Sequence, residues 1–179
     1  MGDALRENVW VYRLLFVALA LVVLFLRILP IGGAPGGLPG PDLLLCLMLA
    51  WVTQRPDHLP APLIAAVILL EDMILMRPPG LWAAIVLMAT EFLRGRSALT
   101  RELGFATEWV LIAGVMVAML LAYRLIFAVA FLEQPGFGFA LAQTIGSILS
   151  YPLVVGVLRV AINLRKPSTG EVDDKGRRL

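Results

Sequence analysis

The chain has 179 residues, of which 60% are hydrophobic and only 16% are charged, with a net charge of +2. Soluble globular domains carry about 25% charged residues, so a water-soluble fold of this size could not bury so much apolar side chain. These values exclude an ordinary soluble enzyme, give no sign of nucleic-acid binding, and predict a membrane protein surrounded by lipid.

Six apolar segments follow one another along the chain, and a helix needs about 17–25 such residues to cross a membrane. The second segment is short and the third carries charges. The first has too long an apolar core for a signal peptide. We therefore predict an all-α fold: one six-transmembrane-helix bundle over residues 1–166, then a disordered cytoplasmic tail over 167–179. The expected spans are residues 9–29, 42–53, 59–76, 79–93, 107–132 and 137–164.

The segments between these spans are rich in proline and glycine. Residues 30–41 cannot form a regular helix or strand, and residues 77–80 and 133–136 are typical of tight turns. Short turns make neighbouring helices antiparallel, so the chain ends of successive spans should alternate between the two membrane faces.

The distribution of lysine and arginine predicts the orientation, because basic residues accumulate in cytoplasmic loops. With the N-terminus inside, the outer loops hold only Arg27 and Arg77. This bias predicts that both chain ends lie inside. The basic residues of the inner segments are Arg6, Arg13, Arg55, Arg94, Arg96, Arg101, Arg165, Lys166, Lys175, Arg177 and Arg178.

Charged residues inside a membrane span are costly and normally face a partner, a cavity or the bundle interior. Five such residues are candidates: Glu71, Asp72, Glu91, Arg124 and Arg159. From their depths we expect Arg124 to pair with Glu71 or Asp72, and Arg159 to pair with Glu91. Structural ion pairing is the favoured interpretation. Contact with another subunit and a proton or cation pathway are the alternatives, and Arg159 could simply reach the membrane interface.

Adjacent residues of a helix point about 100° apart. Glu71 and Asp72 therefore should not both face one seam, and we expect one inside the bundle and the other at the headgroups or a partner. Asp42, at the start of the second span, is a further candidate for a polar interaction.

Small residues recur at every fourth position in the last two spans. Such patterns let helix backbones approach closely. We expect them to pack within this chain's own bundle rather than in a homodimer. They are Gly114, Ala118 and Ala122 in the fifth span, and Ala142, Gly146 and Ser150 in the sixth.

A search for catalytic chemistry finds no candidate. His58, the only histidine, lies in a loop and should be solvated, and with the single cysteine, Cys46, it cannot form a zinc site. No phosphate-binding glycine loop or nucleophile motif is present. We therefore expect no enzymatic activity, no metal and no cofactor.

The stretch from Gly40 to Ala84 resembles the signature region of the rod shape-determining protein MreD family. The resemblance covers nearly the whole chain through the order and spacing of short motifs. Asp72 takes the place of the family's Asp. A glycine is common shortly before that Asp, but here Glu71 precedes it directly, and residues 77–79 replace a small Ser/Gly turn. The matching motifs are Gly40-Pro41-Asp42-Leu43-Leu44-Leu45, Trp51, Arg55-Pro56, Glu71-Asp72-Met73-Ile74-Leu75, Pro79-Gly80-Leu81, Tyr151-Pro152-Leu153 and Leu158-Arg159-Val160.

This resemblance implies a non-enzymatic scaffold of the bacterial inner membrane, acting in cell elongation. Its implied partners are MreC, MreB, the glycosyltransferase RodA and a penicillin-binding transpeptidase. The implied fold is similar to the six-helix substrate-binding components of vitamin transporters, so small-molecule binding or transport is the alternative. A transporter-like protein requires an outward-facing cavity lined by Trp, Asn or charged groups, whereas a scaffold can have its charges neutralised and its cavity filled.

Overall fold

The computed structural model describes residues 2–29, 39–97, 104–131 and 136–161, and every regular element within them is helical. The predicted all-α fold is confirmed, and each predicted span coincides with one α-helix to within a few residues at most ends. The tail predicted to be disordered, 167–179, lies outside the described residues. The elements are α1 (Gly2–Ile28), α2 (Leu43–Gln54), the 3-10 helix η1 (Pro56–His58), α3 (Ala61–Ile74), α4 (Leu81–Gly95), α6 (Phe105–Val129) and α7 (Phe137–Ala161).

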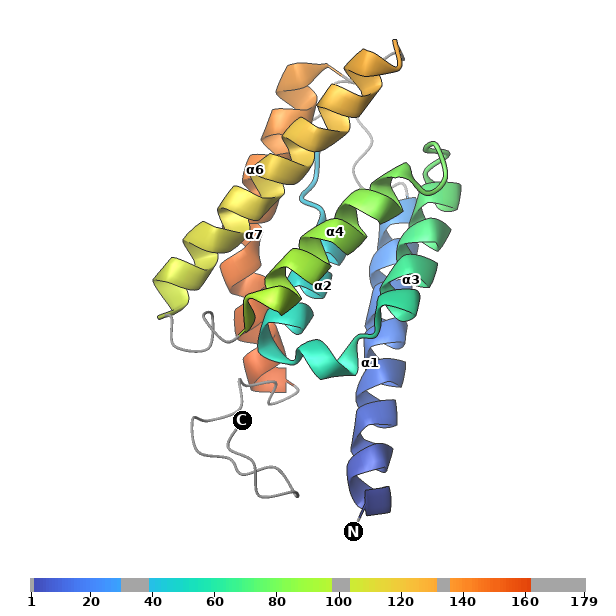
Figure 1. Cartoon of the computed structure of the whole chain (residues 1–179), viewed down its shortest axis with the longest axis vertical. Coiled ribbons are helices and arrows are strands. Elements are labelled where there is room, and N and C mark those ends of the chain that lie inside the picture. Colours follow the sequence, from blue (N-terminus) through green and yellow to red (C-terminus); the bar gives the residue numbers. More distant parts are fainter. Residues whose placement is uncertain (1, 30–38, 98–103, 132–135, 162–179) are drawn as a thin grey trace.

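Successive α-helices run in opposite directions (Figure 1). The end of α1, the start of α2, the α3–α4 turn and the start of α7 lie together at one end of the bundle, which we call the Arg27 end. The start of α1 and the end of α7 lie at the opposite end, which we call the N-terminal end. The described chain is thus an antiparallel bundle, as the short turns predict.

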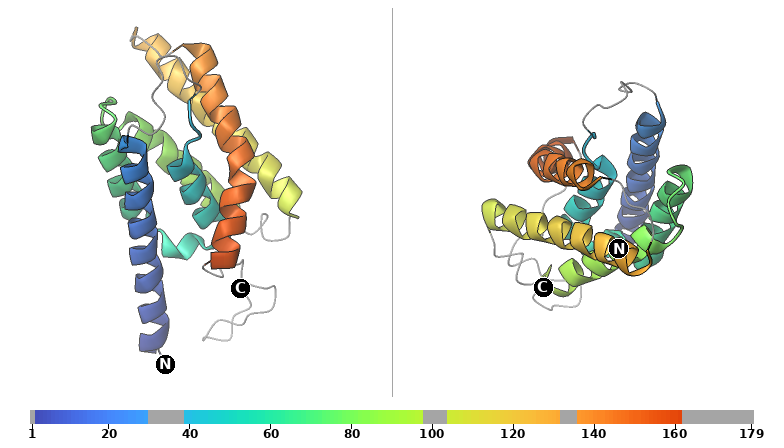
Figure 2. Two further views of the ribbon diagram at one scale, coloured as in Figure 1. Left: turned by 180° about the vertical axis from the view of Figure 1, so that it is seen from behind. Right: turned by 90° about the horizontal axis from the view of Figure 1, so that it is seen from above.

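Helix α2 forms the centre of the bundle. It packs against α7, α4 and α1, and it is buried on all sides from Leu44 to Gln54 (Figure 2). A helix that is apolar all round belongs in the interior of a bundle, surrounded by other helices. The largest buried side chain, Trp51, meets Phe16 of α1 edge to face, with ring centres 5.4 Å apart.

Within the described residues, three helices are long and apolar enough to cross a membrane: residues 9–28 of α1, α6, and residues 137–160 of α7. Helices α2, α3 and α4 have 12, 14 and 15 residues, corresponding to lengths of about 18, 21 and 22 Å. The hydrocarbon core of a bilayer is about 30 Å thick. The structure therefore supports a membrane protein with three clear candidate spans. Helices α2, α3 and α4 are each shorter than the hydrocarbon core is thick.

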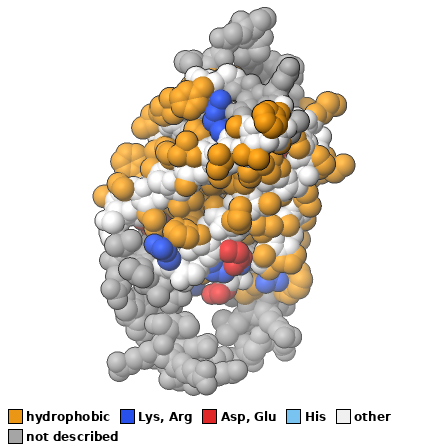
Figure 3. Space-filling view, turned by 45° about the horizontal axis from the view of Figure 1, so that its top comes forward, with side chains coloured by type: hydrophobic (Ala, Val, Ile, Leu, Met, Phe, Trp, Pro, Cys, Tyr) orange, Lys and Arg blue, Asp and Glu red, His pale blue; other side chains and the backbone are white. Residues whose placement is uncertain are grey.

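The surface of the bundle is apolar where a soluble protein would be polar. Leu14, Val129, Leu153 and Val160 are among many large apolar side chains that are more than two-thirds exposed. In the view of Figure 3 apolar side chains cover most of the visible face, while charged side chains gather towards its ends. Lipid is the solvent that such a surface requires.

The loop around η1 differs from the expectation of a solvated histidine. His58 is half-buried, and its ring stacks on Tyr12 of α1 with centres 4.8 Å apart. Its carbonyl oxygen accepts a hydrogen bond from Arg13 Nε at 3.2 Å. Burial, and then the nearby Arg55 guanidinium, lower the pKa of His58 below its ordinary value of 6.5. The histidine thus fastens the η1 loop to α1 in its neutral form.

Candidate functional site

The Arg27 end holds a cluster of three charged side chains from three helices or their ends. Arg27, at the end of α1, forms ion pairs with Asp42, whose Oδ1 lies 3.3 Å away, and with Glu71 of α3. Glu71 is fully buried, and Asp42 is 5% exposed. Because a buried carboxylate is costly without a partner, both acids depend on the single positive charge of Arg27.

Asp42 also organises the start of α2. Its Oδ1 accepts the Leu45 N–H at 3.1 Å, which is the geometry of an N-cap. Its own N–H donates to Ser147 Oγ of α7 at 2.8 Å. Asp42 therefore ties the central helix to α1 and α7 at the same time.

Asp72 has a different role from its neighbour. Its Oδ2 accepts the Gly80 N–H at 3.2 Å and the Ala83 N–H at 3.4 Å, so it satisfies backbone donors at the start of α4. Both acids are fully buried. The expectation that one of them faces the headgroups or a partner is therefore wrong: Glu71 points towards α1, while Asp72 points towards α4.

The ion pairs predicted from depth also need correction. Glu71 pairs with Arg27 rather than Arg124, whose guanidinium lies 5.0 Å from the centre of the Phe137 ring. Glu91 pairs with Arg94, one turn further along α4, rather than with Arg159. Depth along a helix gives one coordinate only, and it does not tell which neighbouring helix a side chain faces.

Arg159 lies at the N-terminal end. Its guanidinium carbon is 5.2 Å from the centre of the Phe105 ring, at the start of α6. This cation–π contact fixes the ends of α6 and α7 against each other. Arg159 is thus far from the cluster around Arg27 and belongs to the packing of the opposite end.

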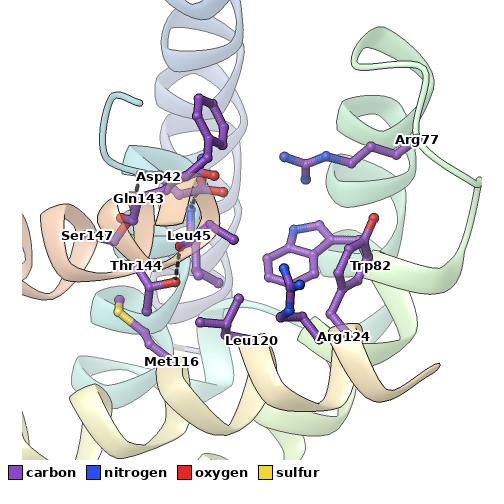
Figure 4. A pocket seen from close by; sticks show the side chains of 13 residues that line it. Asp42, Leu45, Arg77, Trp82, Met116, Leu120, Arg124, Gln143, Thr144 and Ser147 are labelled. Carbon is purple, nitrogen blue, oxygen red and sulfur yellow. Dashed lines mark hydrogen bonds between the residues drawn. The ribbon is translucent and has the colours of Figure 1, made fainter. Parts of the chain in front are cut away.

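A cavity of about 170 Å³ adjoins the charged cluster (Figure 4). Its walls come from the start of α2, the α3–α4 turn, α4, α6 and α7. Figure 4 shows Arg77 extending towards it from the turn, with Trp82 below and Gln143 and Thr144 on the other side. The buried acids thus have ion-pair or hydrogen-bond partners, while a cavity beside them stays open.

An open apolar groove of about 500 Å³ lies between α4 and α6. Helix α4 contributes Ile85, Met88 and Phe92, and α6 contributes the small residues Gly114, Ala118 and Ala122. A Cβ atom added at Gly114 would meet nothing within 4 Å. The expectation that this small-residue pattern packs within the chain is therefore wrong at Gly114.

The equivalent pattern on α7 behaves as expected. A Cβ atom at Gly146 would lie 3.8 Å from Pro41, just before α2. Small residues thus bring α7 close to the central helix, whereas those of α6 border an open groove.

A second buried polar group lies nearer the N-terminal end, around Glu108 of α6. Its Oε1 accepts the Tyr151 hydroxyl at 3.1 Å, and that hydroxyl lies 3.2 Å from Thr53 Oγ1 of α2. Glu108 and Tyr151 are fully buried. These bonds join α2, α6 and α7 and point to a structural role.

The sequence pattern did not single out three residues that take part in the buried polar contacts or line the cavity: Arg27, Arg77 and Glu108. A signal existed for the first two, since they are the only basic residues in predicted outer loops and so depart from the usual charge distribution. Glu108 was placed at a predicted helix start, where an acid is common, so its burial carried no sequence signal.

Within the described residues no group of three or more His, Cys, Asp and Glu side chains could hold a metal ion. No protein-family model, curated protein or solved structure matches the chain.

Proposed function

We propose that this chain is a non-enzymatic scaffold of the bacterial inner membrane, of the MreD type, that binds the single membrane helix of a partner. The observation that carries the proposal is the α4–α6 groove, in which Gly114 has open space at its Cβ position. In lipid, helices associate through close backbone packing at small residues. A groove bordered by Gly114, Ala118 and Ala122 suits a helix better than it suits a polar solute.

The scaffold crosses the membrane six times, with both chain ends inside. Helices α2, α3 and α4 are short, but non-spanning lengths are tolerated when backbone at membrane depth is buried in protein. Helix α2 is enclosed by α1, α4 and α7, and Asp72 satisfies amides at the start of α4. The bilayer can also thin locally around short helices at a modest cost.

MreC is the partner that the family resemblance supplies. Its single membrane helix would lie in the groove, against Phe92 and Met88 on one side and the small residues of α6 on the other. The arginines at the end of α4, Arg94 and Arg96, would face the cytoplasm and partners such as MreB. RodA and a penicillin-binding transpeptidase would join through the assembled complex, so that the bundle links cytoplasmic filaments to peptidoglycan synthesis and maintains rod shape.

Co-purification with MreC tests this proposal. Gly114→Leu should fill the groove and reduce the recovery of MreC at least about tenfold, a loss equal to about 1.4 kcal/mol. Gly156→Leu is the matched control, because Gly156 is also an exposed helical glycine with open space at its Cβ position. Equal recovery with both variants would contradict the groove as the binding surface. Self-association lost only in Gly114→Leu would assign the groove to a second copy instead.

The polar cavity favours one second candidate, a small-molecule-binding or transport protein resembling a vitamin-transporter component. That function requires a cavity lined by Trp or charged groups, and Trp82 and Arg77 line this one. Solute uptake driven by the purified chain alone in vesicles would favour transport. Loss of rod shape on depletion, without any uptake, would favour the scaffold.

A further inference from the structure

Arg77 is one of three charged side chains that line the cavity at the Arg27 end, the others being Asp42 and Arg124. The guanidinium carbon of Arg77 lies 5.7 Å from the centre of the Trp82 ring. In the described part of the chain no carboxylate lies within ion-pair distance of Arg77. A guanidinium carries five N–H donors in a planar fork, a shape that matches carboxylate and phosphate oxygens.

The turn before α4 holds Arg77 in this position. Met76 and Gly80 on either side have positive φ angles of 51° and 91°. The Arg77 N–H donates to the Asp72 carbonyl at 3.0 Å, and the Asp72 side chain binds Gly80. The left-handed conformation is costly for a non-glycine residue and persists where the surroundings fix it. The turn therefore fixes the backbone of Arg77 beside the cavity.

Two further donors face the same space. Trp82 Nε1 is buried and has no hydrogen-bond partner among the described residues, and in the view of Figure 4 it lies on the side of Arg77. The Gln143 amide comes from the opposite wall, on α7. A buried N–H without an acceptor has lost its hydrogen bond to water without replacing it, and a ligand oxygen would supply the missing acceptor.

The acids nearby do not compete for these donors. Asp42 lines the cavity, but its Oδ1 already accepts from Arg27 and from the Leu45 N–H. Glu71 is held by Arg27, and Asp72 by the amides of α4. The lining of the cavity thus offers a ligand the guanidinium groups of Arg77 and Arg124 together with the N–H donors of Trp82 and Gln143.

A second hollow, of about 470 Å³, continues from the cavity and shares Arg77, Phe139 and Gln143 with it. Its other walls include the apolar side chains of Val23, Leu26 and Leu43. Polar donors therefore adjoin an apolar surface at one end of the long helices. This combination suits a molecule with an anionic head and an apolar body.

We infer that this cavity binds a phosphate-bearing anion, with Arg77, Trp82 and Gln143 donating to the phosphate oxygens, and that the phosphate is the headgroup of an anionic lipid whose chain lies along Val23 and Leu26. The site is separate from the α4–α6 groove, because the two face different sides of α6. Lipid binding at this site does not require that the bundle act as a scaffold.

Thermal unfolding of the detergent-purified full chain tests the inference with three added probes: dihexanoyl phosphatidylglycerol, dihexanoyl phosphatidylcholine and inorganic phosphate. Phosphatidylglycerol should raise Tm in a saturable way. Arg77→Gln should weaken its apparent affinity at least about tenfold, as expected for one charge-assisted hydrogen bond. Trp82→Phe keeps an aromatic ring but removes the N–H. It should weaken the apparent affinity for phosphatidylglycerol severalfold.

Arg96→Gln is the matched control, since Arg96 also lies over an aromatic ring, that of Phe92, but at the other end of α4. It should bind phosphatidylglycerol as the wild type does. Inorganic phosphate acting as well as the lipid would confirm the anion site and assign it to a free phosphate. Equal responses to phosphatidylglycerol and phosphatidylcholine, or an unchanged affinity in both Arg77→Gln and Trp82→Phe, would overturn the inference.

Discussion

At the scale of single residues, two of the buried acids of this bundle share one arginine, which the sequence places in a predicted outer loop. Arg27 is 24% exposed at its side chain, and it reaches both Asp42 and the fully buried Glu71. A guanidinium can bind two carboxylates because its donors spread over a planar fork. Removing one partner from such a cluster costs more stability than the ion pair itself contributes, because it leaves an unpaired charge buried.

Arg27→Gln should therefore destabilise the folded chain by about 3 kcal/mol. The double variant Arg27→Gln with Glu71→Gln should recover a large part of that loss, because the second substitution removes the stranded charge. Unfolding in mixed micelles with increasing denaturing detergent measures both. Additive losses in the double variant would show that the two side chains are not coupled.

His58 should make the stability of the η1 loop depend on pH. Its pKa in the folded chain lies below 6.5, so the unfolded chain binds the proton more readily as pH falls through that value. Stability should accordingly decrease below about pH 6.5. Proteolysis between α2 and α3 as a function of pH measures this opening.

His58→Phe keeps a ring to stack on Tyr12 and removes the titrating group, so the acid-induced increase in cleavage should disappear. If the variant opens below pH 6.5 as readily as the wild type, another group causes the effect.

At the scale of helices, the sequence predicts where the elements lie but not how they meet. Apolar runs and proline-glycine breaks place all six helices, because length and hydropathy are properties of one segment. The partner of Glu71 and the burial of Asp72 depend on which helices are neighbours, which is a property of several segments together. The small-residue patterns of α6 and α7 look alike in the sequence, and only Gly146 is packed within the chain.

The α3–α4 turn offers a test of this local geometry. Gly80 has a φ angle of 91°, a left-handed conformation that costs an L-residue with a side chain about 1 kcal/mol or more. Gly80→Ala should therefore lower stability by about that amount. Gly114→Ala, within a regular helix with open space beside it, should be neutral or slightly stabilising.

Denaturing-detergent titrations of the two alanine variants give the comparison directly. Equal stabilities would mean that the turn does not need the conformation seen at Gly80, and the placement of Arg77 would lose its support.

At the scale of the whole molecule, the described chain is a bundle that combines three long helices with three short ones. The central α2 is buried from Leu44 to Gln54 and has no need to span lipid by itself. This arrangement leaves a polar cavity at the Arg27 end and an apolar groove on one side, two surfaces of different chemistry on opposite faces of α6. The sequence predicts a membrane protein, because composition alone indicates that class. It predicts neither the cavity nor the groove.

Orientation in the membrane can be checked by cysteine labelling in a Cys46→Ala background. Gly136→Cys at the Arg27 end should react with a membrane-impermeant maleimide added outside intact spheroplasts, whereas Gly104→Cys should react only after lysis. Both glycines are exposed and have open space for a side chain. The opposite pattern would invert the proposed topology.

The central claim is that the α4–α6 groove holds the membrane helix of MreC, and photo-crosslinking in intact membranes tests it most directly. A photoreactive residue at Ala118, in the groove, should form an adduct with MreC. The same residue at Val157, on the exposed side of α7, should not. Adducts from Val157 alone, or from neither position with both proteins present in the membrane, would contradict the account.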